Sequence, residues 1–219
     1  MVQQAERIIA YLHVLHEDGD IYEVRVVGTK ATMSAYLKAG KDDGILMKII
    51  HEHQDLTFFQ TMNIVSDDIY SREQCRKLVS APKATTKDSE VKRYIWFLID
   101  LDPRRPSGIS ATDEEKAAAH AKAQLIYKHL RSRGFCDPVV ADSGNGYHLL
   151  YRIDASVEDK ETVATALKVL SMWYSDEQVE IDTTVGNPAR ITKLYGTMAT
   201  KGANTPERPH RMSQLISVP

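Results

Sequence analysis

Near the middle of this chain, an apolar run ends in two acids. Residues 94–101 read YIWFLIDL, with Asp100 inside the run and Asp102 directly after it. A nearly continuous apolar run of this kind is typical of a central strand buried on both faces of a sheet. Residues at i and i+2 of a strand project from the same face, with Cα atoms about 6–7 Å apart. We therefore expect both carboxylates to stand side by side at the end of a buried strand.

Helix and strand signals alternate after this run. Thr112 and Glu115 form a capping box ahead of an Ala-rich segment, and Gly134 is typical of the residue just past a helix end. Asn145 and Gly146 indicate a hairpin between two short strands. The expected elements are a helix at residues 112–134, strands at 138–141 and 147–153, a helix at 157–174 and a strand at 178–182.

This order, strand–helix–strand–strand–helix–strand, is that of a ferredoxin-like or RRM-like βαββαβ unit with both helices on one face of the sheet. In such a unit the first and third strands are central neighbours, and the fourth lies at the edge beside the first. The expected fold class is therefore α+β. The fold alone decides nothing about function, because RNA binders, metal transporters and polymerases share it.

The first 90 residues predict a separate αβ module. Helical spacing of apolar residues and runs of β-branched residues mark its elements. The expected elements are helices at residues 3–16, 43–53 and 71–79, and strands at 21–27 and 56–64. The polar stretch at 81–90 is the expected boundary, which divides the chain into modules at residues 1–90 and 91–219.

Composition excludes several classes of protein. Cys75 and Cys136 lie outside any Cys/His cluster, so we expect no zinc site and no disulfide, but free thiols in a reducing cytoplasm. No stretch approaches 18 apolar residues, so neither a membrane span nor a membrane partner is expected. The net charge of −2 does not exclude a nucleic-acid partner, because basic residues gather between positions 183 and 211.

Three carboxylates are the strongest candidates for chemistry. Asp100 and Asp102 will repel each other unless a cation lies between them, and Mg²⁺ prefers oxygen ligands of this kind. Asp182 ends the last expected strand, where it can approach this pair. Three carboxylates on one sheet face are what a site for two metal ions about 3.5–4 Å apart requires. The alternative is a set of ordinary acids where strands pass into loops.

The hairpin offers candidate phosphate-binding groups. A glycine-flanked turn at Ser143 and Gly144 would leave backbone N–H groups free for phosphate oxygens. Strand alternation places His148 and Tyr147 on opposite faces, so His148 can share a face with the acids of a neighbouring strand. The alternative is a tight hairpin with a satisfied histidine.

Basic residues follow the third acid along the chain. Arg190 and Lys193 could neutralise negative charge on a transferred phosphoryl group. The alternative is a solvated basic loop. Other candidates for binding a template strand or an initiating nucleotide are Arg104, Arg105, Asn187, His210 and Arg211.

Three stretches, FLIDLDP, SGNGYHLLY and EIDTTVGNPARITKLYGT, resemble motifs I, II and III of the archaeo-eukaryotic primase superfamily. The nearest members are the prim-pol domains of phage, plasmid and CRISPR-associated primase-polymerases. The resemblance covers residues 85–211 and, more loosely, 22–72. It implies that Asp100, Asp102 and Asp182 bind the catalytic metals. It also implies that Ser143, Gly144 and His148 hold nucleotide phosphates, and that Arg190 and Lys193 support the triphosphate.

The resemblance further implies a DNA-templated primase-polymerase. Such an enzyme would use two Mg²⁺ or Mn²⁺ ions, NTP or dNTP substrates and a single-stranded or primed DNA template. Its N-terminal αβ module would pack against the RRM-like module, with the active cleft between them. Related chains often continue into a helicase domain, so this chain is expected to be a domain excised from a longer protein. The cysteine cluster with which some relatives bind zinc is missing.

Two other classes of function fit parts of the pattern. An RRM-like module without catalysis would bind single-stranded nucleic acid by stacking bases on Tyr147 and Tyr151. A metal-dependent nuclease or a nucleotide cyclase would also use paired acids on this kind of fold.

Overall fold

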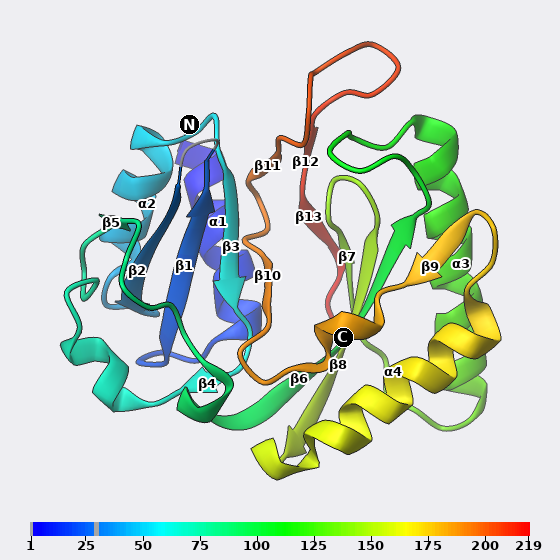
Figure 1. The fold of residues 1–219 in the computed structure, drawn as a ribbon, viewed down its shortest axis with the longest axis horizontal. Helices are drawn as coiled ribbons and strands as arrows, with labels where there is room; N and C mark the ends of the chain where they lie inside the picture. The colour runs from blue at the N-terminus through cyan, green and yellow to red at the C-terminus, as the bar shows by residue number, and fades with distance from the viewer. Residues whose placement is uncertain (1, 29–30) are drawn as a thin grey trace.

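Two antiparallel sheets lie side by side in the computed structural model, which describes residues 2–28 and 31–219 (Figure 1). The first sheet has the strand order β10-β3-β1-β2-β5. Its strands are β1 (Ile21–Val27), β2 (Thr32–Lys38), β3 (Thr57–Thr61), β5 (Val79–Ser80) and β10 (Ile191–Lys193). Two helices, α1 (Val2–Leu15) and α2 (Asp43–Glu52), supply apolar side chains to a core that buries one face of this sheet.

The second sheet has the order β13-β7-β8-β6-β4, and β9 pairs with β6 beyond this path. Its strands are β4 (Ile64–Val65), β6 (Val91–Pro103), β7 (Val139–Asp142), β8 (Tyr147–Ala155), β9 (Val179–Ile181) and β13 (Gln214–Ser217). Helices α3 (Asp113–Ser132) and α4 (Lys160–Tyr174) cover the side of this sheet that faces away from the first sheet (Figure 1). A small separate ribbon joins β11 (Met198–Ala199) to β12 (Arg211–Met212).

The register of the second sheet confirms the expected neighbours of its first strand. The long strand β6 pairs antiparallel with β8 and with β9, which correspond to the expected third and fourth strands. The capping box is also confirmed, because Thr112 Oγ1 accepts from the backbone N–H of Glu115, and Glu115 accepts from that of Thr112. Gly134, just past the helix, has the left-handed φ of 87° that its position requires.

The expected helix at residues 71–79 is wrong. A short 3₁₀ helix (η1, Asp67–Ser71) precedes this segment, which then runs as turns into β5. The backbone N–H of Tyr36 donates to Gln74 O, and the N–H of Arg76 donates to Tyr36 O. These bonds to β2 replace the bonds that a helix would make within itself. Strand β2 was not expected at all, although it pairs with β1 along its whole length.

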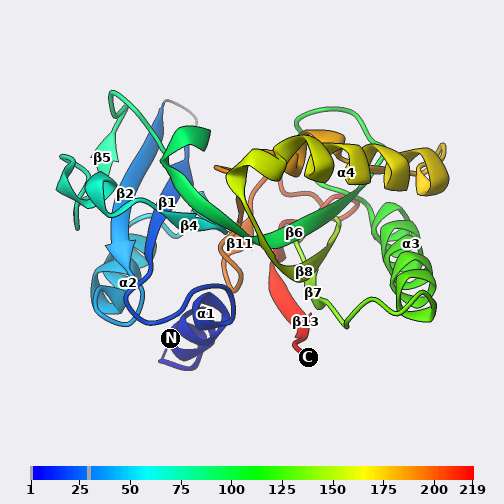
Figure 2. The ribbon, with the colours of Figure 1, turned by 90° about the horizontal axis from the view of Figure 1, so that it is seen from below.

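The two halves of the chain exchange strands. Strand β10 comes from the second half but pairs with β3 in the first sheet, whereas β4 comes from the first half and pairs with β6. Helix α1 packs against the cores of both sheets. Ile8 and Leu12 belong to the core of the first sheet, and Leu15 belongs to the core of the second. Figure 2 shows this helix near β13, the last strand of the chain. Each half of the chain, divided at the expected boundary at residue 90, therefore contributes a strand to the sheet of the other half.

None of the helices in the described part of the chain is long and apolar enough to cross a membrane.

Candidate functional site

A cleft of about 660 Å³ lies between the two sheets. Val27, Thr57 and Phe59 of the first sheet line one wall, and the opposite wall includes Asp100 and Asp102. Both acids lie on the face of β6 that carries Leu98, whereas the alternate residues of the strand point toward the helices. The prediction that the two carboxylates share a face is confirmed.

Asp100 stands in a row with residues of the strands on both sides. It is the register partner of His148 on β8, and His148 Nε2 lies 3.3 Å from Asp100 Oδ1. On the other side, the backbone N–H of Asp182 donates to Asp100 O over 3.0 Å. The sheet register thus brings His148, Asp100 and Asp182 together as cross-strand neighbours.

The side chain of Asp182 does not join the other two acids. Its Oδ1 accepts from the backbone N–H of Thr184 and so caps the short helix η4 (Thr183–Gly186). Asp182 is also absent from the cleft lining. Within residues 2–28 and 31–219, no three His, Cys, Asp or Glu side chains converge in a way that would hold a metal ion. The expected convergence of three carboxylates is therefore not seen, because a local cap takes up the third.

The charge balance at Asp102 favours a cation. Burial raises the pKa of the Asp102 carboxyl above its ordinary value, and the nearby charge of Asp100 raises it further. Arg105 opposes this rise in pKa, with its Nη1 3.5 Å from Asp102 Oδ1. Two carboxylates that destabilise each other on one face of a cleft are suitable ligands for a divalent metal.

His148 is held from behind by two buried hydroxyl groups. Its Nδ1 lies 2.6 Å from Tyr195 Oη and 3.3 Å from Thr192 Oγ1, and these two oxygens are 3.2 Å apart. Sequence reasoning did not identify Tyr195 or Thr192. Both lie in the motif-like stretch that ends in LYGT, but their contact with His148 depends on how β10 and the chain after it fold back.

The loop at 143–146 connects β7 to β8, as the hairpin prediction requires, but it has little free backbone. The N–H of Gly144 donates to Asp142 Oδ1, and the N–H of Gly146 donates to Ser143 Oγ. The prediction that these groups are free to bind phosphate is wrong, because the loop uses them to hold its own shape. Ser143 still lines the cleft with its side chain.

Gly144 and Gly146 allow this loop to pack closely against its surroundings. Gly144 has a left-handed φ of 95°, and a Cβ on it would lie 2.5 Å from Ala199 Cβ. A Cβ on Gly146 would lie 2.2 Å from the carbonyl oxygen of Leu101. These distances leave no room for a side chain, so both glycines hold the loop against its neighbours.

Two lysines face the acids across the cleft. Lys193 is buried, and its Nζ lies 5.0 Å from the centre of the Phe59 ring. Burial lowers the pKa of Lys193 to about 7, and the charge of Lys201 adds to this lowering. Lys201 also lines the cleft, although sequence reasoning did not select it as a site residue. Arg105 and His210, two candidates for binding a template strand or an initiating nucleotide, also line the cleft.

Besides Asp182, five expected site residues lie outside the cleft lining, and one of them is Gly144 of the hairpin loop. Arg104 pairs with Glu180, and Arg211 pairs with Asp113 at the start of α3. Arg190 and Asn187 line a separate groove. Arg190, which the resemblance predicts to support the triphosphate, thus does not line the cleft that holds the acids. The reason is that Arg190 Nε donates to Asn187 Oδ1, which turns the side chain back along its own loop.

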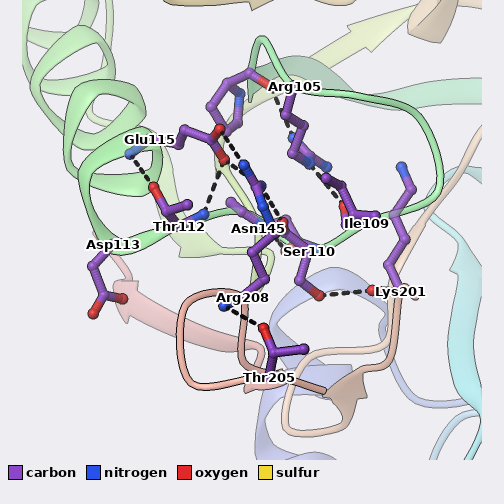
Figure 3. A network of polar contacts seen from close by, with 12 residues as sticks. Arg105, Ile109, Ser110, Thr112, Asp113, Glu115, Asn145, Lys201, Thr205 and Arg208 are labelled. Atoms are coloured by element: carbon purple, nitrogen blue, oxygen red, sulfur yellow. Dashed lines mark hydrogen bonds and ion pairs between the residues drawn. The ribbon is translucent and has the colours of Figure 1, made fainter. Parts of the chain in front are cut away.

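A polar network fixes the loops around the open end of the cleft (Figure 3). Arg208 donates to both carboxylate oxygens of Glu115, the residue that completes the cap of α3. Ser110 Oγ donates to Lys201 O, and the N–H of Ala111 donates to Asn145 Oδ1. The network therefore joins the segment that carries Lys201 and the hairpin loop to the start of α3.

Comparison with known proteins identifies the fold alone. No family model and no curated protein matches this sequence. The crystal structure of primase RepB' is similar, with a TM-score of 0.54 and 11% identity, over 98% of this chain and 56% of that one. The catalytic domain of primase RepB' in complex with initiator DNA is also similar, with a TM-score of 0.53 and 10% identity, over 96% and 85% of the two chains. This chain thus spans a little over half the length of the first of these structures.

Proposed function

We propose that the chain is a primase-type nucleotidyltransferase of the archaeo-eukaryotic primase superfamily, which extends or starts a strand on a DNA template. The observation that carries the proposal is the cleft itself. Paired acids on one wall face Lys193 and Lys201 across it, in a fold similar to that of a primase catalytic domain. The strand order β7-β8-β6-β9, with two helices on one side, supports an RRM-like βαββαβ unit at its centre.

Asp100 and Asp102 are the proposed metal ligands, and Mg²⁺ or Mn²⁺ are the proposed metals. The raised pKa of Asp102 supports this choice, because burial and the charge of Asp100 both destabilise its ionised form, which a bound cation would stabilise. Asp182 is the proposed third ligand, since it is the cross-strand neighbour of Asp100 and would need only to release the N–H of Thr184. The metals would neutralise negative charge on the phosphates and activate the attacking hydroxyl.

The reaction proposed is attack of a 3′-hydroxyl on the α-phosphate of an NTP or dNTP, with release of pyrophosphate. The residues of the chain would bind and orient the triphosphate, because positioning and charge neutralisation account for most of the catalysis in phosphoryl transfer. Lys193 and Lys201 are the proposed partners of the phosphate oxygens. His148 and Ser143 lie near the acids and would donate hydrogen bonds from the opposite side.

The structure gives little support to an RRM-like module that stacks bases on Tyr147 and Tyr151. Both tyrosines lie on the helix-covered face of β8. Tyr147 stacks on His120 of α3, with ring centroids 4.8 Å apart, and Tyr151 is only 4% exposed. Neither ring is presented to a nucleic-acid strand in the cleft, so this alternative loses the aromatic platform that it requires.

The test is a synthesis assay with labelled DNA. The protein is incubated with a single-stranded template, with and without a primer, and with all NTPs and dNTPs and Mg²⁺ or Mn²⁺. Asp100→Ala and Asp102→Ala should abolish synthesis, whereas Asp154→Ala, an exposed acid of β8 paired with Arg93, should not. Products without primer would identify a primase. Shortened templates would indicate a nuclease, and synthesis retained in both acid variants would refute the proposal.

A further inference from the structure

A second hollow of about 230 Å³ lies beside the cleft. We call it the side groove. Arg25, Lys87 and Arg190 line it, together with Asn187 and neighbouring residues. Ile191 lines both hollows, so the side groove and the cleft are neighbours at β10. It is not part of the proposed nucleotide site, because Asp100 and Asp102, two of the three proposed metal ligands, line the cleft, and none of the three lines the groove.

Both hollows lie on one face of the first sheet. Phe59 on β3 is the cross-strand partner of Lys193 on β10 and of Arg25 on β1. Side chains directly opposite one another in a sheet project from the same face, so Lys193, Phe59 and Arg25 form a row that crosses from cleft to groove. Neighbouring strands are about 4.8 Å apart, which makes this row roughly 10 Å long. In Figure 1, β3 and β10 form the side of the first sheet that lies toward the second sheet.

The middle of this row is apolar and accessible. Phe59 is partly exposed and lines the cleft, and Val27, two residues beyond Arg25 on the same face, is 43% exposed. An aromatic ring between cations is the usual arrangement for binding single strands without sequence preference, because every base has a face that can stack.

Two cations of the side groove, Arg190 and Lys87, form no salt bridge in the described part of the chain, and Glu90, the acid nearest in charge to Lys87, is already paired with Arg72. The guanidinium of Arg190 donates to Asn187 Oδ1 and Thr184 O, which are both neutral. No carboxylate in residues 2–28 and 31–219 forms a salt bridge with Arg190 or Lys87. Both side chains are therefore available to a ligand.

The other charged groups of the side groove are held by partners within the protein. Arg25 donates two hydrogen bonds to the buried carboxylate of Glu23, which fixes its guanidinium and neutralises its charge. Asp88 also lines the groove, and its Oδ1 accepts from Asn187 Nδ2 and from the N–H of Ala189. These two bonds offset part of the charge of Asp88, which leaves Arg190 and Lys87 as the cations that an anion would meet.

We propose that the single-stranded part of the template runs along this face, with a base on Phe59 and its phosphates at Arg190 and Lys87 in the side groove. The proposal rests on the proposed function for the identity of the strand. Phosphates are the natural partners of the two cations, and such contacts position a strand without reading its sequence. The acids on the opposite wall would repel the same backbone, which favours the first sheet as its support.

The test measures binding, not synthesis. The affinity of the whole protein for a labelled oligothymidylate is determined by fluorescence anisotropy over a range of salt concentrations. For Lys87→Gln/Arg190→Gln the affinity should fall about tenfold or more. The plot of log K against log salt concentration should also become shallower by about 0.7 for each phosphate that the variant no longer neutralises. Phe59→Leu should weaken binding about tenfold with an unchanged slope, because it removes stacking and no charge.

The matched control is Lys128→Gln/Arg133→Gln, which removes two exposed cations at the far end of α3. It should bind as the wild type does. Equal affinity and slope in the groove variant and this control would overturn the proposal, as would a wild-type protein that does not bind the oligonucleotide. Synthesis assays on the same samples separate the two proposals. If the groove variant binds the oligonucleotide more weakly but no sample synthesises DNA or RNA, the side groove is supported and the polymerase proposal is refuted. If the wild type synthesises and the groove variant binds as tightly as the control, the polymerase proposal stands and the side groove is refuted.

Discussion

His148 and Tyr195 are joined by a buried hydrogen bond of 2.6 Å between Nδ1 and Oη. The other ring nitrogen, Nε2, lies 3.3 Å from Asp100 Oδ1. A carboxylate only accepts, so in the neutral imidazole Nε2 carries the proton and Nδ1 accepts from the hydroxyl of Tyr195. Burial raises the pKa of Tyr195, which keeps this hydroxyl protonated. The pair therefore holds the imidazole with its N–H directed toward the acids of the cleft.

Tyr195→Phe should disturb this orientation without removing the ring. We expect kcat/KM for the nucleotide to fall about tenfold and the free energy of unfolding to fall by about 1 kcal/mol, the typical contribution of one hydrogen bond. Steady-state nucleotide incorporation and urea unfolding measure the two effects. Tyr127→Phe, on the partly exposed surface of α3, is the control. An unchanged kcat/KM in Tyr195→Phe would mean that the hydroxyl has no part in placing His148.

Asp102→Asn should make the protein more stable at neutral pH while abolishing synthesis. The pKa of Asp102 is raised, so folding at pH 7 must keep a carboxylate ionised where its charge is unfavourable. The amide removes this cost. The gain in Tm over the wild type should shrink as the pH falls through the raised pKa toward the ordinary pKa of aspartate, where the wild-type carboxyl is protonated. Thermal melts from about pH 3.5 to 8 measure this difference, and a gain that does not change with pH would contradict it.

Divalent metal should stabilise the wild-type protein through the same acids. A ligand that binds only the folded state stabilises it by RT ln(1 + [L]/Kd) and so raises Tm as its concentration rises above Kd. We expect millimolar Mg²⁺ or Mn²⁺ to raise Tm by a few degrees, EDTA to reverse the effect, and Asp100→Asn to remove it. Asp182→Asn should reduce the shift if its carboxylate turns toward the pair. An equal shift in all variants would place the metal elsewhere.

Lys193 should take up a proton when a nucleoside triphosphate binds. Its pKa is lowered to about 7, so at pH 8 most molecules carry a neutral amine. Phosphate oxygens favour the charged form and would raise this pKa above 8, which draws one proton from the buffer. Calorimetry in two buffers of different ionisation enthalpy measures the uptake. Lys193→Met should abolish it and Lys168→Met, on the exposed face of α4, should not; equal uptake in both variants would exclude Lys193 as its source.

Gly146→Ala should destabilise the protein, because the new Cβ would overlap the carbonyl oxygen of Leu101 at 2.2 Å. Overpacking of this kind typically costs about 1–3 kcal/mol. Gly44→Ala in α2 is the matched control, since a Cβ there meets nothing within 4 Å. That substitution should stabilise the protein by about 0.5–1 kcal/mol, because alanine is the better helix former. Urea unfolding of both variants measures the contrast, and equal changes would show that the loop can move aside.

Local features of the chain were predictable because neighbouring residues decide them. The capping box of Thr112 and Glu115 needs only residues three apart, and strand alternation alone places Asp100 and Asp102 on one face. The same reasoning failed at residues 71–79 and missed β2. The segment at 71–79 bonds to Tyr36 of β2, across a separation that no local pattern encodes. Strand β2 itself pairs with β1, the strand directly before it, and this hairpin was missed.

The buried strand ending in two acids, the helices after it and the hairpin can be read from the sequence, since propensity, periodicity and capping act within a few residues. Which groups meet depends on the folded chain as a whole. Sheet register placed His148 opposite Asp100, and folding back of the chain after β10 brought Tyr195 behind it. Competition among nearby partners turned Asp182 toward Thr184 and Arg190 toward Asn187. Register and side-chain partners are set by the free energy of the whole packed chain, so no short stretch of sequence specifies them.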